Sequence, residues 1–88
     1  MSILPAPHDD LDRLLREEKQ RVALEFFEDA WQAALDEGIE PAILAETAVE
    51  AALTGLDREE GQSSVARLVA ALGERCENGA FIADRVLQ

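Results

Sequence analysis

Few side chains in this sequence could act as nucleophiles or general bases. The chain has one cysteine, Cys76, one histidine, His8, and two adjacent serines, Ser63 and Ser64. A cysteine or serine nucleophile needs a base beside it, and the sequence positions no histidine to serve Cys76. Apolar residues at helical spacing around Cys76 indicate a buried structural thiol instead. We therefore expect no catalytic residue, no cofactor and no enzyme activity.

Carboxylates are the abundant reactive group. Glu25, Glu28 and Asp29 recur at i, i+3 and i+4, which places them on one face of a helix, and Glu46 and Glu50 stand one helical turn apart. Dinuclear metal sites in helical bundles combine such carboxylates with Glu-x-x-His pairs. A chain with a single histidine cannot supply those pairs, so we expect no specific metal site.

The formal net charge of −11 is unevenly distributed along the chain. Between Val22 and Arg58 there is no Lys or Arg, although eight Asp or Glu residues precede Asp57 there. Such a field repels nucleic-acid phosphates and anionic membranes and attracts basic proteins. We therefore expect no direct binding to nucleic acid or membrane, and a basic protein partner instead. The predicted contact residues are Glu25, Glu28, Asp29, Glu46 and Glu50.

Other interpretations of the acidic sequence stay open. The carboxylates could form a solvated face that keeps a small protein soluble, or they could imitate nucleic acid, which would make the protein an antagonist of a nucleic-acid-binding protein. A third hypothesis is a small enzyme or carrier. Acyl carrier proteins are also small, acidic and helical, but they carry a modified Ser within Asp-Ser-Leu at a helix start. Here Gln62, Ser63, Ser64 and Val65 stand in that place, so the carrier hypothesis lacks its motif.

The elements that must position these side chains are predicted to be helices. Hydrophobic residues make up 48% of the 88 residues, and Ala, Leu and Glu, which favour helix, dominate over β-branched residues. No stretch alternates apolar and polar residues as a half-buried strand does. The single cysteine and the absence of a secretion signal or a long apolar run lead us to expect a cytoplasmic protein.

Glycine and proline positions suggest where the helices begin and end. Gly38, Gly55 and Gly79 are placed to end helices, Pro41 to begin one, and Asp57 to cap another. We predict a flexible tail over 1–8 and a single helical domain over 9–88. The predicted helices span about 10–37, 41–54 and 58–77, with a possible short helix over 80–87.

Short turns between these helices favour an all-α, single-domain bundle of three or four helices, with antiparallel neighbours and a long N-terminal helix. In the second half of that helix, Phe26, Phe27 and Trp31 are predicted to lie in the core or at a subunit contact. Its first half carries a narrow apolar stripe amid charged residues. We therefore expect a homodimer, whose predicted contact residues are Leu11, Leu14 and Leu15.

Overall fold

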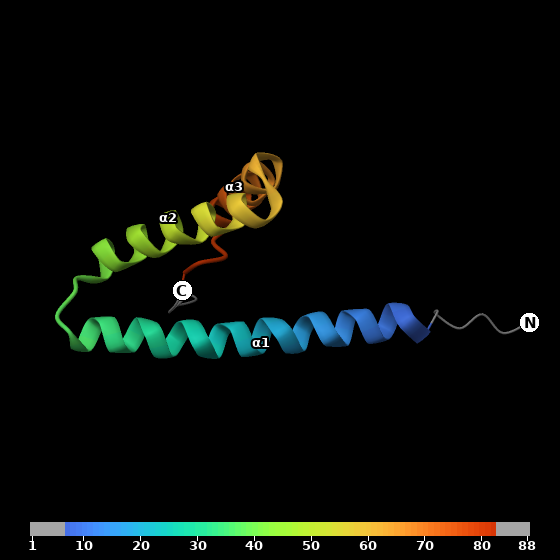
Figure 1. The fold of residues 1–88 in the computed structure, drawn as a ribbon, viewed down its shortest axis with the longest axis horizontal. Helices are drawn as coiled ribbons and strands as arrows, with labels where there is room; N and C mark the ends of the chain where they lie inside the picture. The colour runs from blue at the N-terminus through green and yellow to red at the C-terminus, as the bar shows by residue number, and fades with distance from the viewer. Residues whose placement is uncertain (1–6, 83–88) are drawn as a thin grey trace, which may run out of the picture. The chain divides into compact units, whose positions relative to one another are not determined.

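The computed structural model of the protein describes residues 7–82, and their regular structure is entirely helical (Figure 1). The helices are α1 (Pro7–Asp36), α2 (Pro41–Glu60) and α3 (Gln62–Glu77). The prediction of an all-α chain is confirmed for this part of the sequence, in which there is no strand. Of the predicted tail, residues 1–6 lie outside the described residues, as do residues 83–87 of the possible short helix.

The chain divides into two compact units, residues 1–44 and residues 45–88. The first contains α1 and the first turn of α2, and the second contains the rest of α2 together with α3. Three helices are compatible with a three-helix bundle. The antiparallel arrangement of the helices and the single domain stay predictions.

Helix α1 begins at Pro7, before the predicted start, because proline at a first helical position loses no intrahelical hydrogen bond. Its end follows the predicted signal. Gly38 adopts a φ of 89°, and its N–H donates to the carbonyl of Leu35 at 2.9 Å, while the Ile39 N–H donates to the Ala34 carbonyl at 3.2 Å. These two hydrogen bonds satisfy carbonyls that the helix end leaves without partners.

Helix α2 begins at Pro41, as predicted, but it does not end at the predicted Thr54. It runs through Gly55 to Glu60, so Asp57 lies inside the helix and cannot cap the next one. The Asp57 carbonyl accepts the N–H of Gly61 at 2.9 Å.

The break falls at Gly61, which adopts a φ of 93° that L side chains rarely take. Consequently α3 begins at Gln62 rather than at residue 58, and no side chain caps its start.

Helix α3 ends at Glu77 in a hydrogen-bonded turn. The Ala80 N–H donates to the Arg75 carbonyl at 2.9 Å, and the Arg75 guanidinium lies 5.2 Å from the centre of the Phe81 ring. Residues 78–81 form turns and Ile82 has no regular structure, so the described beginning of the predicted short helix is not helical.

Among residues 10–82, for which burial is described, none is fully buried. The Phe27 and Trp31 rings lie 5.8 Å apart, yet Phe27 remains 48% exposed and Trp31 is only half-buried. Cys76 is exposed, so the prediction of a buried thiol is wrong. For α1 the physical reason is its length. Thirty residues extend about 45 Å, whereas residues 37–44 of the same unit contribute only one further helical turn.

Candidate protein-docking surfaces on α1 and α2

An apolar stripe follows one side of α1. Leu11 and Val22 are eleven residues apart, as are Leu15 and Phe26. Because eleven residues complete almost exactly three helical turns, these four side chains lie in one row along the helix. We call Leu11, Leu15, Val22 and Phe26 the α1 stripe. Leu11 is 54% exposed, Leu15 49% and Phe26 74%, while Val22 is half-buried, so most of this apolar surface faces solvent.

The C-terminal part of the α1 stripe has carboxylates at its edge. Val22, Glu25, Phe26 and Asp29 line a shallow hollow on the surface of α1. The structure thus brings two of the predicted contact residues, Glu25 and Asp29, into the same hollow as an exposed aromatic ring. Glu28, the third predicted residue on α1, is exposed outside this hollow.

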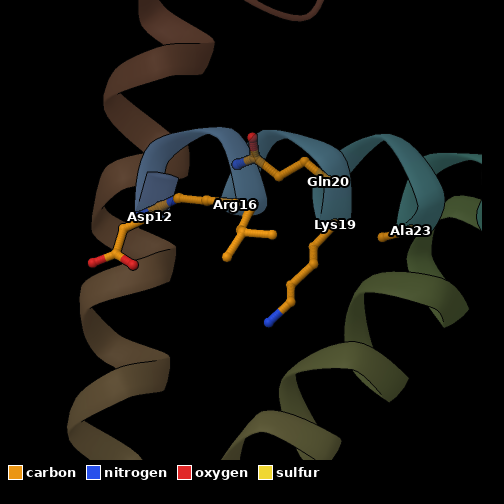
Figure 2. Close-up of a pocket in the computed structure, with 6 residues that line it drawn as sticks. Asp12, Arg16, Lys19, Gln20 and Ala23 are labelled. Atoms are coloured by element: carbon orange, nitrogen blue, oxygen red, sulfur yellow. The ribbon is translucent and has the colours of Figure 1, made fainter. Parts of the chain in front are cut away.

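The N-terminal part of α1 has a hollow of mixed charge, shown in Figure 2. Its lining residues are Asp12, Leu15, Arg16, Lys19, Gln20 and Ala23. Figure 2 shows the Lys19 side chain extended away from the helix. Small-molecule sites bury most of their ligand's surface. Because residues of a single helix line each hollow, both suit protein docking better than enclosure of a small ligand.

Arg21 links the two parts of α1 electrostatically. Its Nε donates to Glu18 Oε1 at 3.2 Å, and its Nη1 donates to Glu25 Oε2. The hydrogen bond from Arg21, followed by its positive charge, lowers the pKa of Glu18. The same hydrogen bond, followed by the negative charge of Glu18, raises the pKa of Arg21. Arg21 is the last cation before Arg58, so this network marks where the acidic segment begins.

The other predicted acidic contacts, Glu46 and Glu50, are both exposed and lie one turn apart on α2. They belong to the second unit, whereas the carboxylates of α1 belong to the first. A single acidic surface joining the two groups stays a prediction. The predicted dimer contacts Leu11, Leu14 and Leu15 are each about half exposed, and their role in a dimer also stays a prediction.

Other reactive groups in the described part of the chain form no recognisable site. The Oγ of Ser64 accepts a hydrogen bond from Arg67 Nη2 at 3.1 Å, so its described contact is with a neighbouring side chain of α3. Within the described residues, no group of three or more His, Cys, Asp or Glu side chains is arranged to hold a metal ion. No helix among these residues is long and apolar enough to span a membrane.

Comparison of this chain with protein-family models, with curated proteins and with solved structures gives no match.

Two features of α1 were missed in the sequence. The sequence predicts Phe26 in the core or at a subunit contact. Its eleven-residue spacing from Leu15 was the signal that the two side chains share one side of α1, but spacing does not determine whether that side is covered. The Arg21 network was also foreseeable, because Glu18 and Glu25 stand three and four residues from Arg21, within reach on a helix.

Proposed function

We propose that this protein is a non-enzymatic regulatory or adaptor protein whose acidic surface binds a basic protein. The contact residues are Glu25, Glu28 and Asp29 on α1 and Glu46 and Glu50 on α2. The observation that carries this proposal is the 74% exposed Phe26 ring, with Glu25 and Asp29 lining the same hollow.

Protein interfaces commonly place an aromatic anchor at their centre and polar or charged residues around it. Phe26 has the position of such an anchor, and Glu25 and Asp29 have that of the rim. A complementary partner has an apolar pocket surrounded by Lys or Arg. The absence of cations between Val22 and Arg58 extends the negative field beyond this hollow, which accelerates encounter with a basic protein.

We further propose that the protein is a cytoplasmic homodimer, with Leu11, Leu14 and Leu15 among its contacts. The exposed apolar side chains of α1 support this proposal, because burying them against another subunit removes apolar surface from water. Within each subunit, antiparallel packing of the long α1 with the other two helices completes the proposed three-helix bundle.

The test is a pull-down from lysate of the source cells with three tagged baits. The first is the wild-type protein, and the second carries Glu25→Lys, Glu28→Lys and Asp29→Lys. The third is a control with the same change in net charge, made on exposed residues elsewhere by Glu59→Lys, Glu74→Lys and Glu77→Lys. Circular dichroism first establishes that both variants keep the helical content of the wild type.

A basic protein retained by the wild type and the control, but lost by the α1 variant, is the expected result. Its binding should weaken as ionic strength rises, since salt screens exposed charges. If all three baits recover the same proteins, the α1 carboxylates are not the contact, and they act as a solvated face.

A second candidate function is antagonism of a nucleic-acid-binding protein by charge imitation. It is favoured by the run of residues from Val22 to Asp57, which contains only negative charges. Competition separates the two functions. An antagonist loses its captured protein when DNA or RNA is added, whereas an adaptor that binds elsewhere on the same protein does not.

A further inference from the structure

Resting on the basic-partner function proposed above, we infer that Arg21 regulates the acidic contact on α1 by competing with the partner's Lys or Arg for Glu25. In the free protein the Arg21 guanidinium partly neutralises Glu25. A basic partner must displace this guanidinium, and Glu18 holds it after displacement.

The two carboxylates that line the hollow with Val22 and Phe26 differ in their contacts. Arg21 Nη1 donates a hydrogen bond to Glu25 Oε2, so this carboxylate already has a cation. Asp29, in contrast, forms no hydrogen bond or ion pair with another side chain in the part of the chain that the structure describes. The partner's cations therefore meet one open carboxylate, Asp29, and one occupied carboxylate, Glu25.

Arg21 is the only cation of α1 placed to compete in this way. The other cations of the helix precede Glu25 by six residues or more; they are Arg13, Arg16 and Lys19. Six residues extend a helix by about 9 Å, which exceeds the screening length of about 8 Å at physiological ionic strength. After Arg21 the next Lys or Arg along the chain is Arg58, in the second unit. A substitution at Arg21 therefore changes the charge at the hollow more than a substitution of any other α1 cation.

Glu18 provides the displaced guanidinium with a second acceptor. Arg21 Nε donates to Glu18 Oε1 at 3.2 Å and Arg21 Nη2 donates to Glu18 Oε2, whereas Glu25 accepts one hydrogen bond. The pKa of Arg21 follows the same order, because it is raised first by the hydrogen bond and charge of Glu18 and least by the hydrogen bond to Glu25. All three side chains are more than half exposed, and exposed ion pairs are weak. A partner's cation can thus take Glu25 while Arg21 keeps its two hydrogen bonds to Glu18.

Isothermal titration calorimetry with the basic protein recovered in the pull-down tests the competition. The variant is Arg21→Gln, and the matched control is Arg13→Gln, which changes the net charge equally. Arg13 also forms an ion pair with a carboxylate three residues before it, Asp10, at 3.7 Å. It precedes Glu25 by twelve residues, about 18 Å along the helix, where salt screens its charge. Circular dichroism first establishes that both variants keep the helical content of the wild type.

Arg21→Gln should lower the dissociation constant about threefold, which is the effect of releasing one exposed ion pair. Arg13→Gln should leave the dissociation constant within about 1.5-fold of the wild type. Equal changes in the two variants would show that only net charge matters and would overturn the inference. An unchanged or higher dissociation constant in Arg21→Gln would overturn it as well, because Arg21 would then not oppose the partner.

Removing Glu18 should have the opposite effect, because Glu25 is then the only described acceptor of Arg21. Glu18→Gln should raise the dissociation constant about twofold above that of Glu17→Gln, a control that removes a neighbouring exposed carboxylate outside the network. When Arg21→Gln is added to each, the two proteins should bind equally, since no guanidinium remains. A difference that persists without Arg21 would overturn this role of Glu18.

The pull-down with the lysine variants separates the competition from the function on which it rests. If no basic protein depends on the α1 carboxylates, both proposals are wrong. If such a protein is recovered but Arg21→Gln binds it no more tightly than Arg13→Gln does, the competition alone is wrong and the acidic contact stands.

Discussion

Replacing Phe26 by alanine should weaken binding of the basic partner without weakening the helix. Full burial of a Phe side chain is worth up to about 3 kcal/mol. The ring is 74% exposed in the free protein, so covering it in the complex contributes about 2 kcal/mol. Alanine retains part of the buried surface, which leaves a loss of about 1.5 kcal/mol. This loss corresponds to a dissociation constant roughly tenfold higher.

The helix itself should not suffer, because alanine favours the helical conformation more than phenylalanine does. The matched control is Phe27→Ala, which removes the same side chain from a position outside the α1 stripe. Isothermal titration calorimetry with the basic protein recovered in the pull-down measures the dissociation constant, and circular dichroism measures the helical content. A dissociation constant of Phe26→Ala within about threefold of the wild type would refute the assignment of Phe26 to the interface. So would an equal weakening by Phe27→Ala.

Three further predictions concern charge and backbone geometry. The pKa of Glu18, measured by NMR titration, should lie below the ordinary Glu range and return to it in Arg21→Gln, because Arg21 is the cause of the shift. Because the pKa of Glu18 is lower in the folded protein, the interaction with Arg21 stabilises α1 at pH values above the ordinary Glu pKa, and this stabilisation is lost as the pH falls through the lowered pKa. An unchanged Glu18 pKa in Arg21→Gln would contradict this explanation. Added salt should lower the dissociation constant of the homodimer, because it screens the repulsion between two chains that each carry a charge of −11. It should raise the dissociation constant of a basic partner, because it screens the attraction between opposite charges. If titrations at two ionic strengths change both dissociation constants in the same direction, the proposed dimer and the proposed acidic contact are not both correct. Gly55→Ala should raise the free energy of unfolding by about 1 kcal/mol, because Gly55 is helical and has open space around it, whereas Gly61→Ala should lower it by about 1–3 kcal/mol because of its positive φ. If urea denaturation shows that the free energy of unfolding changes in the same direction in both variants, the junction between α2 and α3 is wrongly placed.

The all-helical class of this protein could be predicted because it depends on local preferences. Ala, Leu and Glu lose little on entering a helix, and no segment has the period of a strand. The boundary between α1 and α2 was also predictable. Gly38 and Pro41 stand three residues apart, so the signal that ends one helix and the signal that begins the next support each other.

The boundary between α2 and α3 could not be read in this way. Gly55 and Gly61 are both candidates for a helix end, because glycine can adopt a positive φ but is not compelled to do so. In the structure Gly61 adopts it and Gly55 remains helical, at a cost of about 1 kcal/mol relative to alanine. The sequence contains both glycines, but only the folded chain distinguishes them.

The candidate docking surface could likewise be predicted from the sequence only in part. That Glu25 and Asp29 share one side of α1 follows from the helical period, and the structure places both in the hollow beside Phe26. The exposure of Phe26 does not follow, because an apolar side chain is buried only where another element covers it. The sequence by itself determined which residues share a face of each helix, through the fixed rotation per residue. Only the tertiary structure decided which faces are covered, because covering depends on contacts between segments distant in the sequence.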